Sequence, residues 1–95
     1  MIKVVLVDDQ TLVRQGVKSL LSLAESIEVV AEASDGQHAI ELIPTIKPDV
    51  VLMDMRMPVK SGLEAIQELA ALKALPPTII LTTFDDDELV LAGIK

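Results

Sequence analysis

The sequence has 95 residues, a formal net charge of -7 at pH 7, no cysteine and one aromatic residue, Phe84. This length supports one small domain with a single core, and the acidic charge argues against direct binding of nucleic acid or an anionic membrane. The lack of cysteine excludes disulfides and thiolate metal sites, and without a signal start or a long apolar span a soluble cytoplasmic protein is predicted.

The chain opens with a strand followed by a helix. Residues 3–7 form a β-rich apolar run that ends on Asp8 and Asp9. From Thr11 onward, apolar residues recur at helical spacing and predict an amphipathic helix with one apolar stripe. The acidic pair therefore lies between the first strand and the first helix.

A second strand and helix follow. Residues 27–33 predict a strand, and its glutamates favour an edge position in the sheet. Asp35 is expected to cap a helix that runs from residue 37 to about residue 43. Pro44 and Pro48 are expected to end this helix. His38 lies on this predicted helix without a pattern of partner residues, and it is interpreted as a surface residue.

The third unit contains the most informative strand. Residues 50–53 form an apolar run that predicts a strand buried on both faces, and Asp54 stands at its carboxyl end. Residues 61–64 have the capping-box pattern that starts a helix, and Gly62 is interpreted as permitting a turn. Pro76 and Pro77 are expected to stop this helix, whose inward residues are predicted to be Ile66, Leu69 and Ala70.

A fourth strand is predicted over residues 78–82. The acidic run over residues 85–88 suits the positive end of a fourth helix, which would extend toward Lys95. Strands that alternate with helices at this spacing predict right-handed βαβ units around a parallel sheet.

The carboxylates at two strand ends suggest a site. In doubly wound sheets, ligands bind beyond the carboxyl ends of the strands. If the first and third strands are neighbours, Asp8, Asp9 and Asp54 share one cleft, and their repulsion requires a cation. Oxygen ligands without histidine or cysteine fit Mg²⁺ before Mn²⁺ or Ca²⁺.

Such a site suits phosphoryl chemistry. A carboxylate held against Mg²⁺ can attack a phosphoryl group and form an acyl phosphate, with Asp54 as the nucleophile. Thr82, at the end of the fourth strand, could place its hydroxyl on a phosphoryl oxygen. The alternative interpretation is local: Asp8 and Asp9 would cap the first helix, and Asp54 would start a turn.

These residues resemble the receiver domains of two-component response regulators along the whole chain. The resemblance rests on the segments 7–9, 54–58 and 61–62 and on Thr82. The segments 11–16, 29–33 and 81–84 look most like the subfamily with a LuxR-type helix-turn-helix output domain (NarL/FixJ-like). The resemblance implies a flavodoxin-like, doubly wound α/β sheet in the order 2-1-3-4, with residues 1–95 as a receiver domain incomplete at the C-terminus.

The resemblance also implies roles for single residues. Asp54 would accept a phosphoryl group from a histidine kinase. Asp9 and Asp54 would bind Mg²⁺ directly, Asp8 would act mainly through water, and the backbone carbonyl of Arg56 would be a further ligand. Thr82 would move toward the phosphate as the switch hydroxyl. The domain would be regulatory rather than an enzyme, and DNA would be reached only through an output domain not present in this chain.

One departure from the family pattern affects these expectations. The family's fifth strand carries a lysine and an aromatic switch residue, and neither Lys95 nor Phe84 stands at a matching place. Without that strand, residues 79–81 form an exposed edge, which predicts a dimer or exchange of elements between copies. An unphosphorylated dimerisation module is therefore the alternative function. A phosphohydrolase of the haloacid dehalogenase type would need a second aspartate where Arg56 stands.

Overall fold

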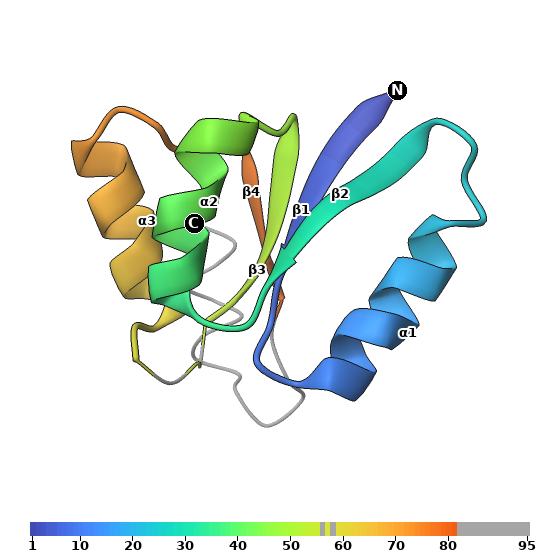
Figure 1. The fold of residues 1–95 in the computed structure, drawn as a ribbon, viewed down its shortest axis with the longest axis horizontal. Coiled ribbons are helices and arrows are strands. Elements are labelled where there is room, and N and C mark those ends of the chain that lie inside the picture. The colour runs from blue at the N-terminus through green and yellow to red at the C-terminus, as the bar shows by residue number, and fades with distance from the viewer. Residues whose placement is uncertain (56, 58, 82–95) are drawn as a thin grey trace.

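The computed structural model describes residues 1–55, 57 and 59–81, in which parallel strands alternate with helices (Figure 1). The strands are β1 (Ile2–Val7), β2 (Ile27–Ala33), β3 (Val50–Asp54) and β4 (Thr78–Leu81), and the helices are α1 (Thr11–Leu21), α2 (Gly36–Ile46) and α3 (Gly62–Ala71). The order β2-β1-β3-β4 confirms the predicted flavodoxin-like sheet, with β2 at an edge. The expected fourth helix lies outside the described residues. Within the described residues, no helix is long and apolar enough to cross a membrane.

The core lies on one face of the sheet. Figure 1 shows α2 and α3 on one side of the strands and α1 on the other. Side chains that alternate along β1 and β3 meet the inward faces of α2 and α3, as period-2 strands require. The fully buried members of this cluster are Val5, Val7, Ala39, Val51, Met53, Ala65 and Leu69.

The opposite face is covered only in part. Leu6, Leu52 and Ile79 occupy one row across β1, β3 and β4. Leu6 is fully buried, Leu52 is half-buried and Ile79 is 56% exposed, so exposure increases away from α1. The prediction that the third strand is buried on both faces is therefore wrong within the described structure, because α1 packs on β1 and β2.

Helix α1 is held at the sheet by charge as well as by apolar contact. None of its residues is buried, and Leu12 and Leu20, from the predicted apolar stripe, are 82% and 69% exposed. Arg14 and Lys18 each place a side-chain nitrogen 3.3 Å from a Glu32 carboxylate oxygen on β2. The long basic side chains thus link the helix to the edge strand, where such partly exposed pairs stabilise modestly.

Helix α2 continues through a proline. Asp35 caps it as predicted, since its Oδ1 accepts the His38 N–H at 2.8 Å, and His38 is exposed. Pro44 was expected to end the helix, but the helix runs on to Ile46. Pro44 removes one backbone donor near the end of the helix, and Ile43 beside it has a buried side chain. The end is set instead by Lys47, whose backbone is left-handed with φ 52°.

Helix α3 begins as predicted and ends earlier. Ser61 and Glu64 form the capping box, with reciprocal backbone contacts of 3.2 and 3.1 Å. Pro76 and Pro77 do not stop the helix, because Lys73 adopts φ 56° directly after it. The Lys73 N–H donates to Ala70 and the Ala74 N–H to Leu69, which is the Schellman pattern. Among the predicted inward residues, Leu69 is buried and Ile66 partly so, but Ala70 is exposed and Ala65 takes its place.

Both helix ends carry lysine where glycine is usual. A side chain with a Cβ in the left-handed region costs about 1 kcal/mol relative to glycine. Lys47 and Lys73 both adopt this conformation, and among the described residues the other non-glycine that does so is Val59. The fold therefore carries strain at the ends of α2 and α3.

We predict that Leu69→Ala lowers the free energy of unfolding by about 2–5 kcal/mol, because it opens a cavity in the core between α3 and the sheet. The matched control is Leu63→Ala on the same helix, where the side chain is 54% exposed. The control should change stability by less than about 1 kcal/mol. Urea unfolding of both variants measures the difference, and equal losses would contradict the assigned core.

Candidate functional site

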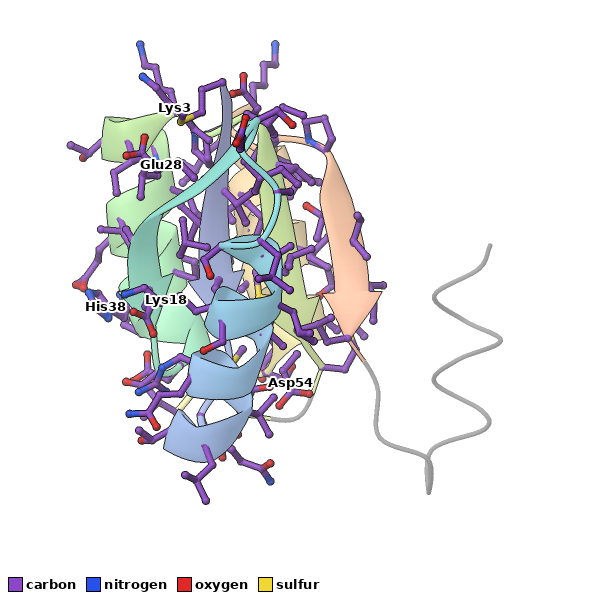
Figure 2. The ribbon with its side chains drawn as sticks, turned by 90° about the vertical axis from the view of Figure 1, so that its right-hand side faces the viewer. Lys3, Lys18, Glu28, His38 and Asp54 are labelled. Atoms are coloured by element: carbon purple, nitrogen blue, oxygen red, sulfur yellow. The ribbon has the colours of Figure 1, made fainter. Side chains whose placement is uncertain are left out.

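Parallel pairing of β1 with β3 brings three carboxylates together. Val7 lies opposite Met53, so the residues that follow, Asp8 and Asp54, lie side by side at the carboxyl ends of the two strands. One carboxylate oxygen from each of Asp8, Asp9 and Asp54 lies within 4.8 Å of the others. Figure 2 shows Asp54 at the end of the molecule to which the strand arrowheads point. The predicted convergence of these residues at the carboxyl edge is confirmed.

Asp8 is the buried member of the cluster. Its relative exposure is 4%, and its Oδ1 accepts the Gln10 N–H at 2.8 Å. Burial raises the pKa of the Asp8 carboxyl above its usual range, and the charge of Asp9 acts in the same direction. The Gln10 N–H and the Arg14 guanidinium lower that pKa, but less than burial raises it. The site thus holds a carboxylate whose ionised form is disfavoured until a cation approaches.

The acidic pair does not serve as a helix cap. The N-cap residue of α1 is Gln10, and no side chain caps that end of the helix by a hydrogen bond. The backbone N–H of Asp8 donates to the Ala33 carbonyl at 3.1 Å, which fixes the chain as it leaves β1. The alternative in which Asp8 and Asp9 cap α1 is therefore wrong.

Arg14 contributes a contact that the sequence did not reveal. Its Nη1 donates to the backbone carbonyl oxygen of Asp8, while its Nε pairs with Glu32. Arg14 thus fixes the backbone that carries the acidic pair. A single basic residue on a helix gives no sequence signal for such a role, because its partners lie on a loop and on another strand.

The donor set suits a hard divalent cation. Three carboxylates without histidine or thiolate are the ligands that Mg²⁺ prefers. Two oxygens on opposite sides of one Mg²⁺ are about 4 Å apart, since each bond is roughly 2.0–2.1 Å. A spread of up to 4.8 Å therefore fits an ion that contacts some carboxylates directly and another through water. Arg56 and Thr82, also predicted for this site, lie outside the described residues.

Gly62 fixes the loop that follows Asp54. It is buried at the start of α3, and its N–H donates to the Met55 carbonyl at 3.0 Å. A Cβ on Gly62 would overlap the Asp54 carbonyl oxygen and lie 2.9 Å from the Met55 Cα. No glycine in the described chain has positive φ, so Gly62 does not act through a left-handed backbone. Its role is the close approach of α3 to the end of β3.

Comparisons with known proteins agree with this geometry. Residues 4–95 match the family model described as the response regulator receiver domain. The transcriptional regulatory protein LnrK of Bacillus subtilis is 41% identical over 95 residues, which are 100% of this chain and 43% of LnrK. LiaR of the same organism, also a transcriptional regulatory protein, is 41% identical over 100% of this chain and 45% of its own length. The chain thus spans less than half the length of these curated relatives.

A solved structure shows the same arrangement of elements. The chain matches the signal receiver domain of the putative response regulator NarL from Mycobacterium tuberculosis. The TM-score is 0.86 and the sequence identity is 35%. The match covers 98% of this chain and 75% of that domain. The structural and sequence comparisons therefore point to the same family.

We predict that Gly62→Ala destabilises the fold by about 2–4 kcal/mol, because a methyl group there must displace the backbone at Asp54. Gly16→Ala is the matched control, since a Cβ on Gly16 meets nothing within 4 Å. That control should stabilise α1 by about 0.5–1 kcal/mol. Thermal unfolding checks both, and a loss of stability in the control alone would contradict the close contact.

We predict that Asp8→Asn raises the midpoint of thermal unfolding at neutral pH in EDTA, because it removes a charge that burial disfavours and that Asp9 repels. A carboxyl whose pKa is raised in the folded state destabilises the fold as the pH rises through that pKa and the group ionises. In acid the Asp8 carboxyl is protonated, so the stability advantage of the variant should vanish there. Addition of Mg²⁺ should stabilise the wild type more than the variant.

Asp35→Asn is the control for this comparison. Asparagine caps a helix as well as aspartate, so this variant should unfold near the wild-type midpoint. An Asp8→Asn variant that is less stable than the wild type in EDTA would show that the ionised carboxylate stabilises the fold.

Proposed function

The chain belongs to the response regulator receiver domain family, and from that premise we propose that Asp54 accepts a phosphoryl group from a histidine kinase. The observation that carries the proposal is the cluster of Asp8, Asp9 and Asp54, whose carboxylate oxygens lie within 4.8 Å of one another. This cluster stands where two neighbouring parallel strands end, the usual place for a ligand in such sheets.

The reaction is an in-line transfer. A carboxylate oxygen of Asp54 attacks phosphorus, the bond from phosphorus to the kinase imidazole nitrogen breaks, and the imidazole leaves with the electron pair. Asp8, Asp9 and Asp54 would hold Mg²⁺, with the Arg56 carbonyl as a further ligand, and the ion would neutralise the phosphoryl charge. Thr82 is proposed as the hydroxyl that responds to the phosphate. These roles for Arg56 and Thr82 come from the resemblance.

The output of the domain is proposed from the relatives. LnrK and LiaR are transcriptional regulatory proteins, and a matched structure from Staphylococcus aureus is a DNA-binding response regulator of the LuxR family, with a TM-score of 0.85 at 29% identity. We propose that residues 1–95 act as the receiver unit of such a regulator in the cytoplasm. Phosphorylation would then control a DNA-binding output domain.

Two other functions have less support. A phosphohydrolase of the haloacid dehalogenase type lacks support, because Arg56 occupies the position of its second aspartate. Association of copies through β4 stays a prediction. Its basis is that β4 is the last strand of the described sheet and that Ile79 on it is 56% exposed.

We predict that incubation with acetyl phosphate and Mg²⁺ adds one phosphoryl group to the wild type, measured by intact-protein mass spectrometry. The adduct should be lost on treatment with hydroxylamine, which cleaves acyl phosphates. EDTA should prevent its formation, because the charges of the acidic cluster then repel the incoming phosphate.

The decisive comparison uses two neutral substitutions on the same strand segment. Asp54→Asn should abolish the adduct, whereas Asp49→Asn, directly before the start of β3, should leave it in place. An adduct on Asp54→Asn would refute the assignment of the phosphoacceptor. Steady release of phosphate from external esters by the wild type would favour a phosphohydrolase instead.

A further inference from the structure

A hollow of about 320 Å³ opens at the amino edge of the sheet, at the end of the molecule opposite the acidic cluster. It lies where α2 and α3 end and where the chain enters β3 and β4, so its walls come from two separate helix-to-strand connections. This volume is at the lower end of the range for small-molecule sites. The residues that line it include Ile43, Pro48, Lys47, Lys73, Leu75 and Pro76.

The floor of this hollow is apolar and its rim is cationic. Ile43 is 1% exposed and Pro48 is buried, so the floor is continuous with the core. Lys47 and Lys73 are both exposed, and neither ammonium group forms a hydrogen bond or ion pair with the described residues. None of the described residues that line the hollow is acidic. Asp49, two residues after Lys47, directs its Oδ2 to the Lys3 N–H at 2.7 Å.

The backbone at both lysines adds an independent observation. Lys47 has φ 52° and Lys73 has φ 56°, a conformation that favours glycine. A cation that only complements a helix dipole could occupy the last helical turn without this strain. Two strained lysines that flank one hollow, in a chain with net charge -7, concentrate positive charge at this place. Strain of this kind points to a function when the strained residues share a site.

We infer that this hollow binds a small amphipathic carboxylate, with its hydrocarbon part against Ile43 and its charged group between Lys47 and Lys73. The apolar floor provides burial for a short chain or ring, and the two ammonium groups provide charge-assisted hydrogen bonds to the carboxylate. The last carbonyl groups of α2 and α3 repel an anion, so binding depends on both lysines. The residues that line this site are distinct from those of the acidic cluster.

The test is a titration of the chain with octanoate below its micelle concentration, followed by amide chemical shifts in NMR spectra. Octanoate should give saturable shifts at Lys47, Lys73 and Leu75. Acetate, which lacks the chain, and octanol, which lacks the charge, should bind at least about tenfold more weakly, because a charged hydrogen bond or several buried methylene groups contribute at least that factor. Equal affinity for octanol and octanoate would overturn the inference.

The matched variants separate binding from helix capping. The double variant Lys47→Gly with Lys73→Gly relieves the backbone strain, so it should unfold at a higher temperature while its octanoate affinity falls at least about tenfold. The double variant with glutamine at both positions removes the charge but keeps the strain, and it should lose the same affinity. Lys18→Gln on α1 is the control and should bind octanoate as the wild type does. Wild-type affinity in either double variant would refute the site.

Discussion

The register between β1 and β3 is the constraint on which the candidate site depends. Val5 and Val7 on β1 and Val51 and Met53 on β3 are fully buried on the side of α2 and α3. A slip by one residue would turn these side chains to the opposite face, so their burial opposes such a slip. The same pairing places Asp8 beside Asp54. The apolar core thus positions the charged site, although none of the core side chains belongs to it.

The acidic cluster destabilises the fold that brings its carboxylates together. Three carboxylates converge at one edge of a protein that already carries a net charge of -7, and burial raises the pKa of Asp8. Functional sites commonly retain such unfavourable charge, and a bound cation or a neutralising substitution relieves it. Backbone contacts keep the cluster in place without a cation: the Asp8 N–H donates to Ala33, and Gly62 packs against the Asp54 carbonyl.

The sequence predicted the features that depend on local chemistry. Apolar runs predicted the four strands of the described residues, and Asp35 and Ser61 predicted where two helices begin. The carboxylates at the strand ends predicted the site. The sequence did not predict the features that tertiary packing determines. The rotation of α3 buries Ala65 instead of Ala70, and α3 ends at Ala71, shortly before the left-handed Lys73, rather than at Pro76.

Partners that are distant in sequence explain the remaining misses. Pro44 stays within α2 next to Ile43, whose side chain is buried in the core that α2 forms with the sheet and α3. The contact of Arg14 with the Asp8 carbonyl requires the position of β2, where Glu32 holds the guanidinium from the other side. Helix α3 also connects the two ends of the sheet: Gly62 at its start touches the Asp54 carbonyl, and Lys73 just after its end borders the hollow. A ligand that displaced α3 along its axis would therefore change the fit of Gly62 against Asp54. By linkage, a change at Asp54 that moved α3 would alter the affinity of the hollow by the same factor.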